Sequence, residues 1–174
     1  MDTQKLKPLD ILLYKGKGFN SWLIRVGTGS IYSHVAVVVD PAINLGIESN
    51  VGHQEGVRAL DLRKLDDSEV DVFRVKPGQS VNTTRTVSFL VDCLGGGFDW
   101  IGVIWLGILK IIGLLTFGGL AFAYHAFQKR KDYFCSELCY AAFNSGGLDI
   151  VPEVGEAETT SPGDISRSLI LVKI

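Results

Sequence analysis

The sequence predicts an α+β fold in a single domain of 174 residues. Strand-like runs of β-branched and apolar residues fill most of the first half of the chain. Helix-like runs follow, and a last strand-like run closes the sequence. Because strands and helices are segregated rather than alternating, an antiparallel sheet packed against helices is expected. A chain of this length can bury a sizeable core.

The elements can be placed coarsely along the chain. The expected strands are 10–14, 35–39, 45–49, 57–60, 70–75 and 169–174. The expected helices are 19–26, 83–94 and a run that begins near residue 135. The run at 35–39 is continuously apolar, which is typical of a central strand. Ser161-Pro162-Gly163-Asp164 has turn composition.

Composition excludes several classes of function. The formal net charge is -2, so a general basic field for nucleic acid is not expected. The cysteines, at 93, 135 and 139, are expected to be reduced thiols, and there is neither a Cys-x-x-Cys motif nor a cluster of histidines that predicts a metal or other cofactor. The first eight residues lack the apolar core of a signal peptide, so a cytoplasmic protein is expected.

Cys135 is the strongest candidate for chemistry. It stands where a loop turns into a helix, with Asp132 as the expected cap and an apolar helical stripe after it. A thiol in the first turn of a helix faces unpaired N–H groups and the positive end of the helix dipole, which favour the nucleophilic thiolate. His34 opens the central strand and is the candidate base. A buried structural cysteine beside a core histidine is the alternative reading.

Glu48 is the expected third member of this group. It lies 14 residues after His34, on the strand that should return from a hairpin. If the strands pair directly, positions of equal parity face the same side, and Glu48 lies opposite or diagonal to His34. A one-residue slip would reverse that face. Asp40, on the His34 face of the same strand, is the competing candidate.

These motifs resemble a known family in their order along the chain. Tyr32-Ser33-His34-Val35-Ala36 comes first, Ile47-Glu48-Ser49 follows, and Phe134-Cys135-Ser136-Glu137-Leu138 comes late. The chain resembles the circularly permuted NlpC-type papain-like proteins, the YiiX/YebB type, whose wider relatives include the lecithin:retinol acyltransferase group. The resemblance implies Cys135 as nucleophile, His34 as base, Glu48 as third polar residue, and a small barrel-like antiparallel sheet on helices.

The residues and the resemblance together predict a cysteine hydrolase or acyltransferase. It would act on an amide, ester or thioester of a lipid or cell-wall peptide through an acyl-enzyme. Tyr32, Ser33 and Ser136 are candidates for binding the substrate or the oxyanion, with the Cys135 backbone N–H. The alternative is a non-enzymatic lipid-binding or membrane-associated module that keeps the papain-like shell.

Trp100 to Tyr124 is the second strong signal. These 25 residues carry one charge, Lys110, and form the core of a hydrophobic helical insertion at about 99–127. A single membrane span would separate His34 from Cys135, so two helical pieces broken near Gly113 or Gly118-Gly119 are expected. A helical pair buried in the fold or in a homodimer, contact with a membrane surface, and a true span remain as alternatives.

Overall fold

One antiparallel sheet organises the protein in the computed structural model, which describes residues 3–51, 55–98, 132–152, 154 and 160–174. The sheet has six strands in the order β4-β3-β2-β1-β5-β6. The strands are β1 (Ile11–Tyr14), β2 (His34–Asp40), β3 (Leu45–Asn50), β4 (Gly56–Asp61), β5 (Val70–Val75) and β6 (Leu171–Lys173). Each expected strand is present, and β2 lies inside the sheet because its apolar residues are buried on both faces.

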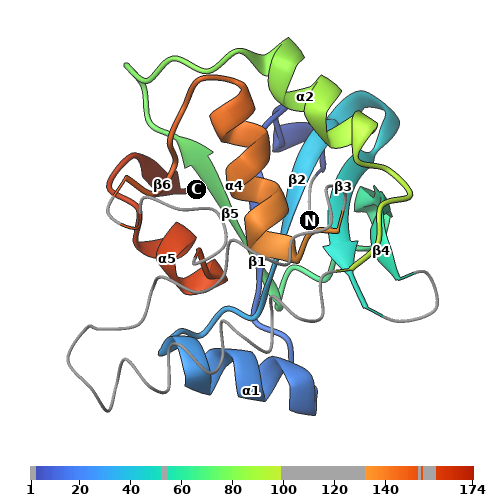
Figure 1. The fold of residues 1–174 in the computed structure, drawn as a ribbon, viewed down its shortest axis with the longest axis vertical. Coiled ribbons are helices and arrows are strands. Elements are labelled where there is room, and N and C mark those ends of the chain that lie inside the picture. The colour runs from blue at the N-terminus through green and yellow to red at the C-terminus, as the bar shows by residue number, and fades with distance from the viewer. Residues whose placement is uncertain (1–2, 52–54, 99–131, 153, 155–159) are drawn as a thin grey trace.

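The described helices are α1 (Phe19–Thr28), α2 (Thr83–Asp92), α4 (Cys135–Ser145) and α5 (Pro162–Arg167). Helix α4 crosses one face of the sheet over β2 and β3, and α2 packs beside it (Figure 1). The expected turn at Ser161 is instead the start of α5. Ser161 and Asp164 bond each other's backbone N–H groups, which is a capping box, so the chain continues into a helix.

The two faces of the sheet have separate cores. The larger core joins one face to α4, and Ile11, Val35, Val37, Leu138 and Phe143 are among its buried members. The smaller core covers the opposite face around Leu12, Ala36, Val38, Val70 and Val72. Alternate residues of β1 and β2 therefore enter different cores, as a pleated strand requires.

Strand β2 contains one extra residue just before its turn to β3. Asp40 pairs with Leu45, whereas Val38 pairs with Gly46, so Val39 has no cross-strand partner of its own. Pro41–Ile43 forms a 3-10 turn that ends at Asn44 in the left-handed conformation. This β-bulge changes which residues of the two strands face each other along the rest of the hairpin.

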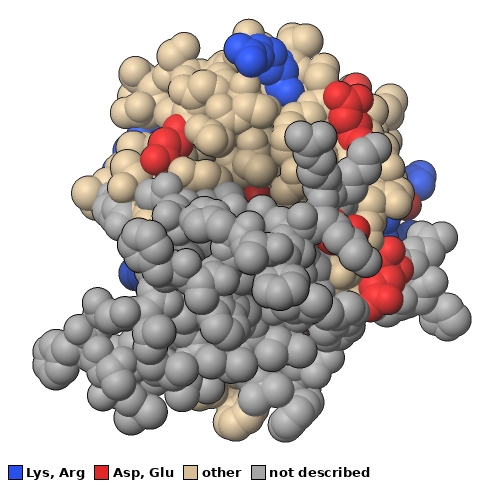
Figure 2. All heavy atoms as spheres, viewed as in Figure 1, with Lys and Arg blue, Asp and Glu red and all other residues tan. Residues whose placement is uncertain are grey.

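The hydrophobic segment Trp100 to Tyr124 lies outside the described residues, as does its expected break near Gly113 or Gly118-Gly119. Within the described ranges, none of the helices combines the length and apolar character needed to cross a bilayer. On the face drawn in Figure 2, the charged side chains of the described residues are scattered rather than gathered into one basic patch.

Candidate active site

Cys135 is the first residue of α4, as the sequence predicts. The helix cap is Phe134 and not Asp132. The N–H of Phe134 donates to Glu137 Oε2 at 3.3 Å, and Asp132 instead accepts the N–H of Gly97 at 3.1 Å. The first N–H groups of a helix have no acceptor within the helix, so the Cys135 side chain and N–H both lie at its positive end.

The segment before Cys135 is held on two sides. The N–H of Tyr133 donates to Gly97 O at 3.3 Å, and the Ser49 hydroxyl donates to Tyr133 O. Ser49 follows Glu48 on β3, so this bond ties the approach to α4 to the strand that carries the candidate carboxylate. The loop around Gly97 is in turn bound to β4, because Val57 N–H donates to Gly96 O at 2.9 Å.

Gly56 makes this loop contact sterically feasible. It has a φ of 102°, and a Cβ placed there would lie 2.1 Å from Gly96 O. Only glycine fits both the backbone conformation and the close approach.

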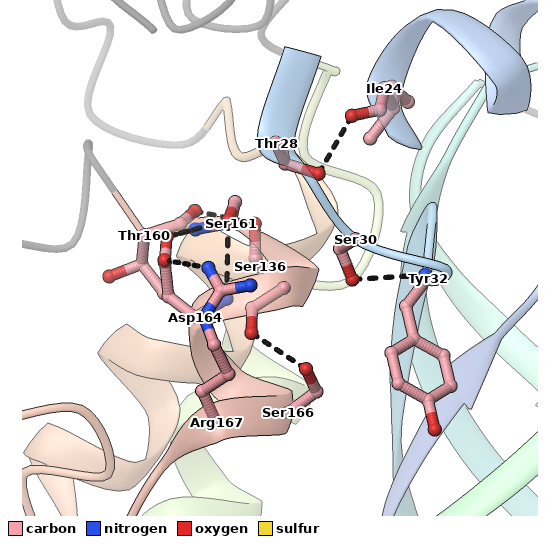
Figure 3. A network of polar contacts seen from close by, with 11 residues as sticks. Ile24, Thr28, Ser30, Tyr32, Ser136, Thr160, Ser161, Asp164, Ser166 and Arg167 are labelled. Atoms are coloured by element: carbon pink, nitrogen blue, oxygen red, sulfur yellow. Dashed lines mark hydrogen bonds and ion pairs between the residues drawn. The ribbon is translucent and has the colours of Figure 1, made fainter. Parts of the chain in front are cut away.

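A further hydrogen bond holds the first turn of α4 against the segment that leads into α5. The Ser136 hydroxyl donates to Thr160 O at 2.7 Å, next to the capping box of α5 (Figure 3). The Ser136 side chain is fully buried. Its hydroxyl is therefore committed to Thr160, and the expectation that it contacts substrate is not supported by its geometry.

His34 and Glu48 form a direct pair. His34 Nε2 lies 2.7 Å from Glu48 Oε2. Ala36 is the cross-strand partner of Glu48, so Glu48 is the diagonal neighbour of His34 on the same face. Asp40, the competing candidate, accepts the N–H of Ala42 in the β2–β3 turn. The structure therefore places Glu48, and not Asp40, beside the histidine.

Two residues that the sequence analysis missed, Tyr14 and Arg58, are cross-strand partners of His34 and Glu48. Tyr14 is the direct partner of His34 across β1 and β2, with ring centroids 5.2 Å apart. Arg58 is the direct partner of Glu48 across β3 and β4, and its Nη2 lies 2.8 Å from Glu48 Oε1. Extending the parity argument to the next hairpin would have found Arg58.

The surroundings set the charge of the pair. Burial lowers the pKa of His34, but the charge of Cys135 and hydrogen bonds with Cys135 and Glu48 outweigh it and raise the pKa to about 10. Burial raises the pKa of Glu48, but the hydrogen bond and charge of His34, with bonds from Arg58 and Asn50, lower it to about 2. Both groups are therefore favoured in their charged forms at neutral pH.

Cys135, His34 and Glu48 all line one cavity of about 400 Å³. Because Nε2 of His34 is occupied by Glu48, Nδ1 is the ring nitrogen left for the thiol. Other polar residues of the lining include Tyr14, Ser33 and Asn50, and its apolar residues are Ile24, Val51, Leu60, Leu65, Val70 and Phe98. The thiol, imidazole and carboxylate chosen from sequence thus line one cavity, between α1, the ends of β1 and β2, and the start of α4.

Tyr32 and Ser33 differ in their placement. The Tyr32 hydroxyl donates to Asp71 Oδ2 at 2.6 Å, and its ring packs edge-on against Phe73, so its side chain belongs to the core and not to the cavity lining. Ser33 does line the cavity, and its hydroxyl donates to Tyr14 O at 3.4 Å.

The three cysteines differ in exposure. All are free thiols, as expected from their number and spacing. Cys93 and Cys139 are buried in the larger core, whereas Cys135 is partly exposed. Burial, followed by the charge of Cys135, raises the pKa of Cys139. Cys139 is therefore a core residue, as its place in the helical stripe predicts.

Comparison with known proteins supports the fold. No family model matches the sequence, and no curated protein matches it. Among solved structures, the protein is similar to the metalloprotein yiiX from Escherichia coli O157:H7, with a TM-score of 0.66 and 17% sequence identity. The match covers 97% of this chain and 96% of yiiX. The two chains therefore share an α+β fold over nearly their whole lengths.

Proposed function

We propose that this protein is a cysteine hydrolase or acyltransferase with a circularly permuted papain-like arrangement. The observation that supports this proposal is the placement of Cys135, at the first position of a helix, in one cavity with the ion-paired His34 and Glu48. Thiol, imidazole and carboxylate in this order form the general pattern of an activated nucleophile, its base and the group that orients the base. The substrate carries an amide, ester or thioester carbonyl.

The first chemical step transfers an acyl group to the enzyme. His34 already holds the proton as an imidazolium beside Glu48. Cys135 Sγ, as the thiolate partner of that imidazolium, attacks the carbonyl carbon. The bond from that carbon to the leaving group then breaks, and His34 returns the proton to the leaving group. Glu48 stabilises the imidazolium, and the Cys135 N–H is placed to donate to the developing oxyanion.

The second step regenerates the thiol. His34 removes a proton from water, or from an acceptor alcohol or amine, which attacks the acyl carbon. The carbon–sulfur bond breaks, and the proton passes from His34 to the departing sulfur. Water as acceptor gives hydrolysis, and an alcohol or amine gives acyl transfer. The same three residues serve both outcomes.

The likeness to a metalloprotein raises the question of a metal. The described residues hold no group of three His, Cys, Asp or Glu side chains suited to a metal ion. Glu48 is shared by His34 and Arg58, and a guanidinium at that carboxylate repels a divalent cation. Cys135, His34 and Glu48, with Arg58 on the carboxylate, therefore do not fit a metal centre, and no step is assigned to a metal. Turnover should be unchanged by EDTA.

Reaction with p-nitrophenyl acetate tests the proposal. The expected result is a burst of p-nitrophenolate with an acetyl adduct on Cys135, found by peptide mass spectrometry. Cys135→Ala should abolish both. Cys139→Ala, one turn along the same helix, is the matched control and should keep them. An unmodified Cys135 in folded wild-type protein would contradict the proposal and favour the non-enzymatic lipid-binding module.

A further inference from the structure

Glu48 is a buried carboxylate whose two oxygens contact different cations. Oε2 faces His34 Nε2 at 2.7 Å. Oε1 accepts from Arg58 Nε at 2.9 Å and Nη2 at 2.8 Å, and from Asn50 Nδ2 at 3.3 Å. The side chain of Glu48 is only 4% exposed, so these contacts replace most of its water. A carboxylate this well buried stays ionised only when its oxygens are satisfied.

Arg58 lies behind this carboxylate. It does not line the cavity that contains Cys135, and its side chain is 29% exposed. It is the direct cross-strand partner of Glu48 on β4, so the sheet itself fixes its approach. Arg58 therefore contacts Glu48 Oε1 from outside the cavity lining, while His34, which lines the cavity, contacts Oε2.

We propose that Arg58 is a positioning residue that keeps Glu48 anionic and turns Oε2 toward His34. This inference rests on the proposed function, because it assigns Arg58 a part in the same reaction. Two N–H donors on Oε1 fix the rotation of the carboxylate. Without them, the buried carboxyl would compete for the proton of the imidazolium, and a neutral Glu48 would no longer stabilise the charge on His34.

The polar groups that contact or lie near Glu48 come from four strands. His34 of β2 and Arg58 of β4 are cations that favour the anion, and Asn50 of β3 donates to it. Tyr14 of β1 is also near, and the Glu48 charge raises the pKa of that phenol, after burial. Tyr14 thus remains neutral. Removing Arg58 leaves His34 as the one described cation on Glu48.

The test compares Arg58→Gln and Arg58→Lys with Arg63→Gln. Arg63, five residues after Arg58 along the chain, is the matched control because it forms an exposed ion pair with Asp61. With p-nitrophenyl acetate, kcat of Arg58→Gln should fall about 10-fold to 100-fold, as expected when general base catalysis is weakened. KM should stay within about threefold, because Arg58 does not contact substrate. Arg58→Lys should recover part of the loss, and Arg63→Gln should match wild type.

A titration without substrate separates this proposal from the proposed function. The Glu48 carboxyl carbon, assigned in NMR spectra with Glu48→Gln, should titrate at a higher pH in Arg58→Gln than in wild type or Arg63→Gln. Circular dichroism confirms that each variant folds. If Arg58→Gln does not fold, the titration is measured on Arg58→Lys instead. Equal titration of Glu48 and equal kcat in all the Arg58 variants would overturn the role of Arg58. A wild-type protein that never acylates would overturn the proposed function, and with it this role.

Discussion

Glu48 lies diagonally across the β2–β3 pair from His34, and its Oε2 stands 2.7 Å from His34 Nε2. A diagonal pair on one sheet face is far apart at the backbone but within reach of two long side chains. The imidazole is therefore held at the end of β2, where α4 brings Cys135 into the same cavity.

Cys135 should react faster than the other two thiols. Iodoacetamide labelling of folded protein at neutral pH, followed by mass spectrometry of each cysteine peptide, should modify Cys135 about 100-fold faster than Cys139, because only exposed thiolate reacts and Cys139 is buried with a raised pKa. Labelling after unfolding in urea is the control and should make the rates similar. Equal rates in the folded protein would contradict this prediction.

His34 should make stability depend on pH. Its pKa is about 10 in the folded protein and 6.5 in the reference state, so its contribution is complete below about 6.5 and is lost as pH rises through about 10. The free energy of unfolding of wild type, relative to His34→Gln, should therefore decrease between these values. Urea unfolding at about pH 6 and about pH 10 measures it. A constant difference would show that the pKa of His34 is not raised by folding.

Glu48 should also make stability depend on pH, but its contribution is lost as the pH falls rather than as it rises. Its pKa falls from 4.5 to about 2 on folding, so its contribution is complete above about 4.5 and is lost as pH falls through about 2. Glu48→Gln should be less stable than wild type at neutral pH, and the two should converge in acid. Asp61→Asn, at an exposed ion pair, is the comparison and should lose much less stability than Glu48→Gln at neutral pH, because solvent screens an exposed pair.

Tyr14 and Tyr32 should respond differently to loss of the hydroxyl. The Tyr14 hydroxyl is buried and has no hydrogen-bond partner among the described residues, so Tyr14→Phe should leave the free energy of unfolding unchanged or raise it by about 1 kcal/mol. The Tyr32 hydroxyl donates to Asp71, so Tyr32→Phe should lower it by about 1.5–3 kcal/mol. Chemical denaturation measures both. A larger loss for Tyr14→Phe would reveal a bonded hydroxyl.

Asp10 and Arg74 should be the costliest ion pair to break outside the cavity. Asp10 is 1% exposed, and Arg74 donates to both of its oxygens at 2.6 Å. Arg74→Met leaves a buried carboxylate without its cation, so the free energy of unfolding should fall by about 3–5 kcal/mol. Arg167→Met, at the more exposed pair with Asp164, is the control and should cost under about 1 kcal/mol. Equal losses would show that burial does not decide the cost.

The sequence by itself determined the local structure of the site. The apolar run after His34 defined β2, and the pattern around Cys135 predicted that a helix begins there. Such signals are local, because strand and helix periodicity and helix ends are written in neighbouring residues. Asp132 was misread as a cap for the same reason, since its bond to Gly97 joins residues 35 positions apart.

Only the tertiary structure decided that Glu48 faces His34. The turn joins Asp40 to Leu45, and that register, continued without interruption, would pair Glu48 with Val37 and turn it toward the opposite face. The bulge at Val39 shifts the register by one residue and restores Glu48 to the His34 face. A bulge depends on how two strands twist and pack rather than on a local sequence pattern. The placement of Arg58 on Glu48 follows from the same long-range pairing.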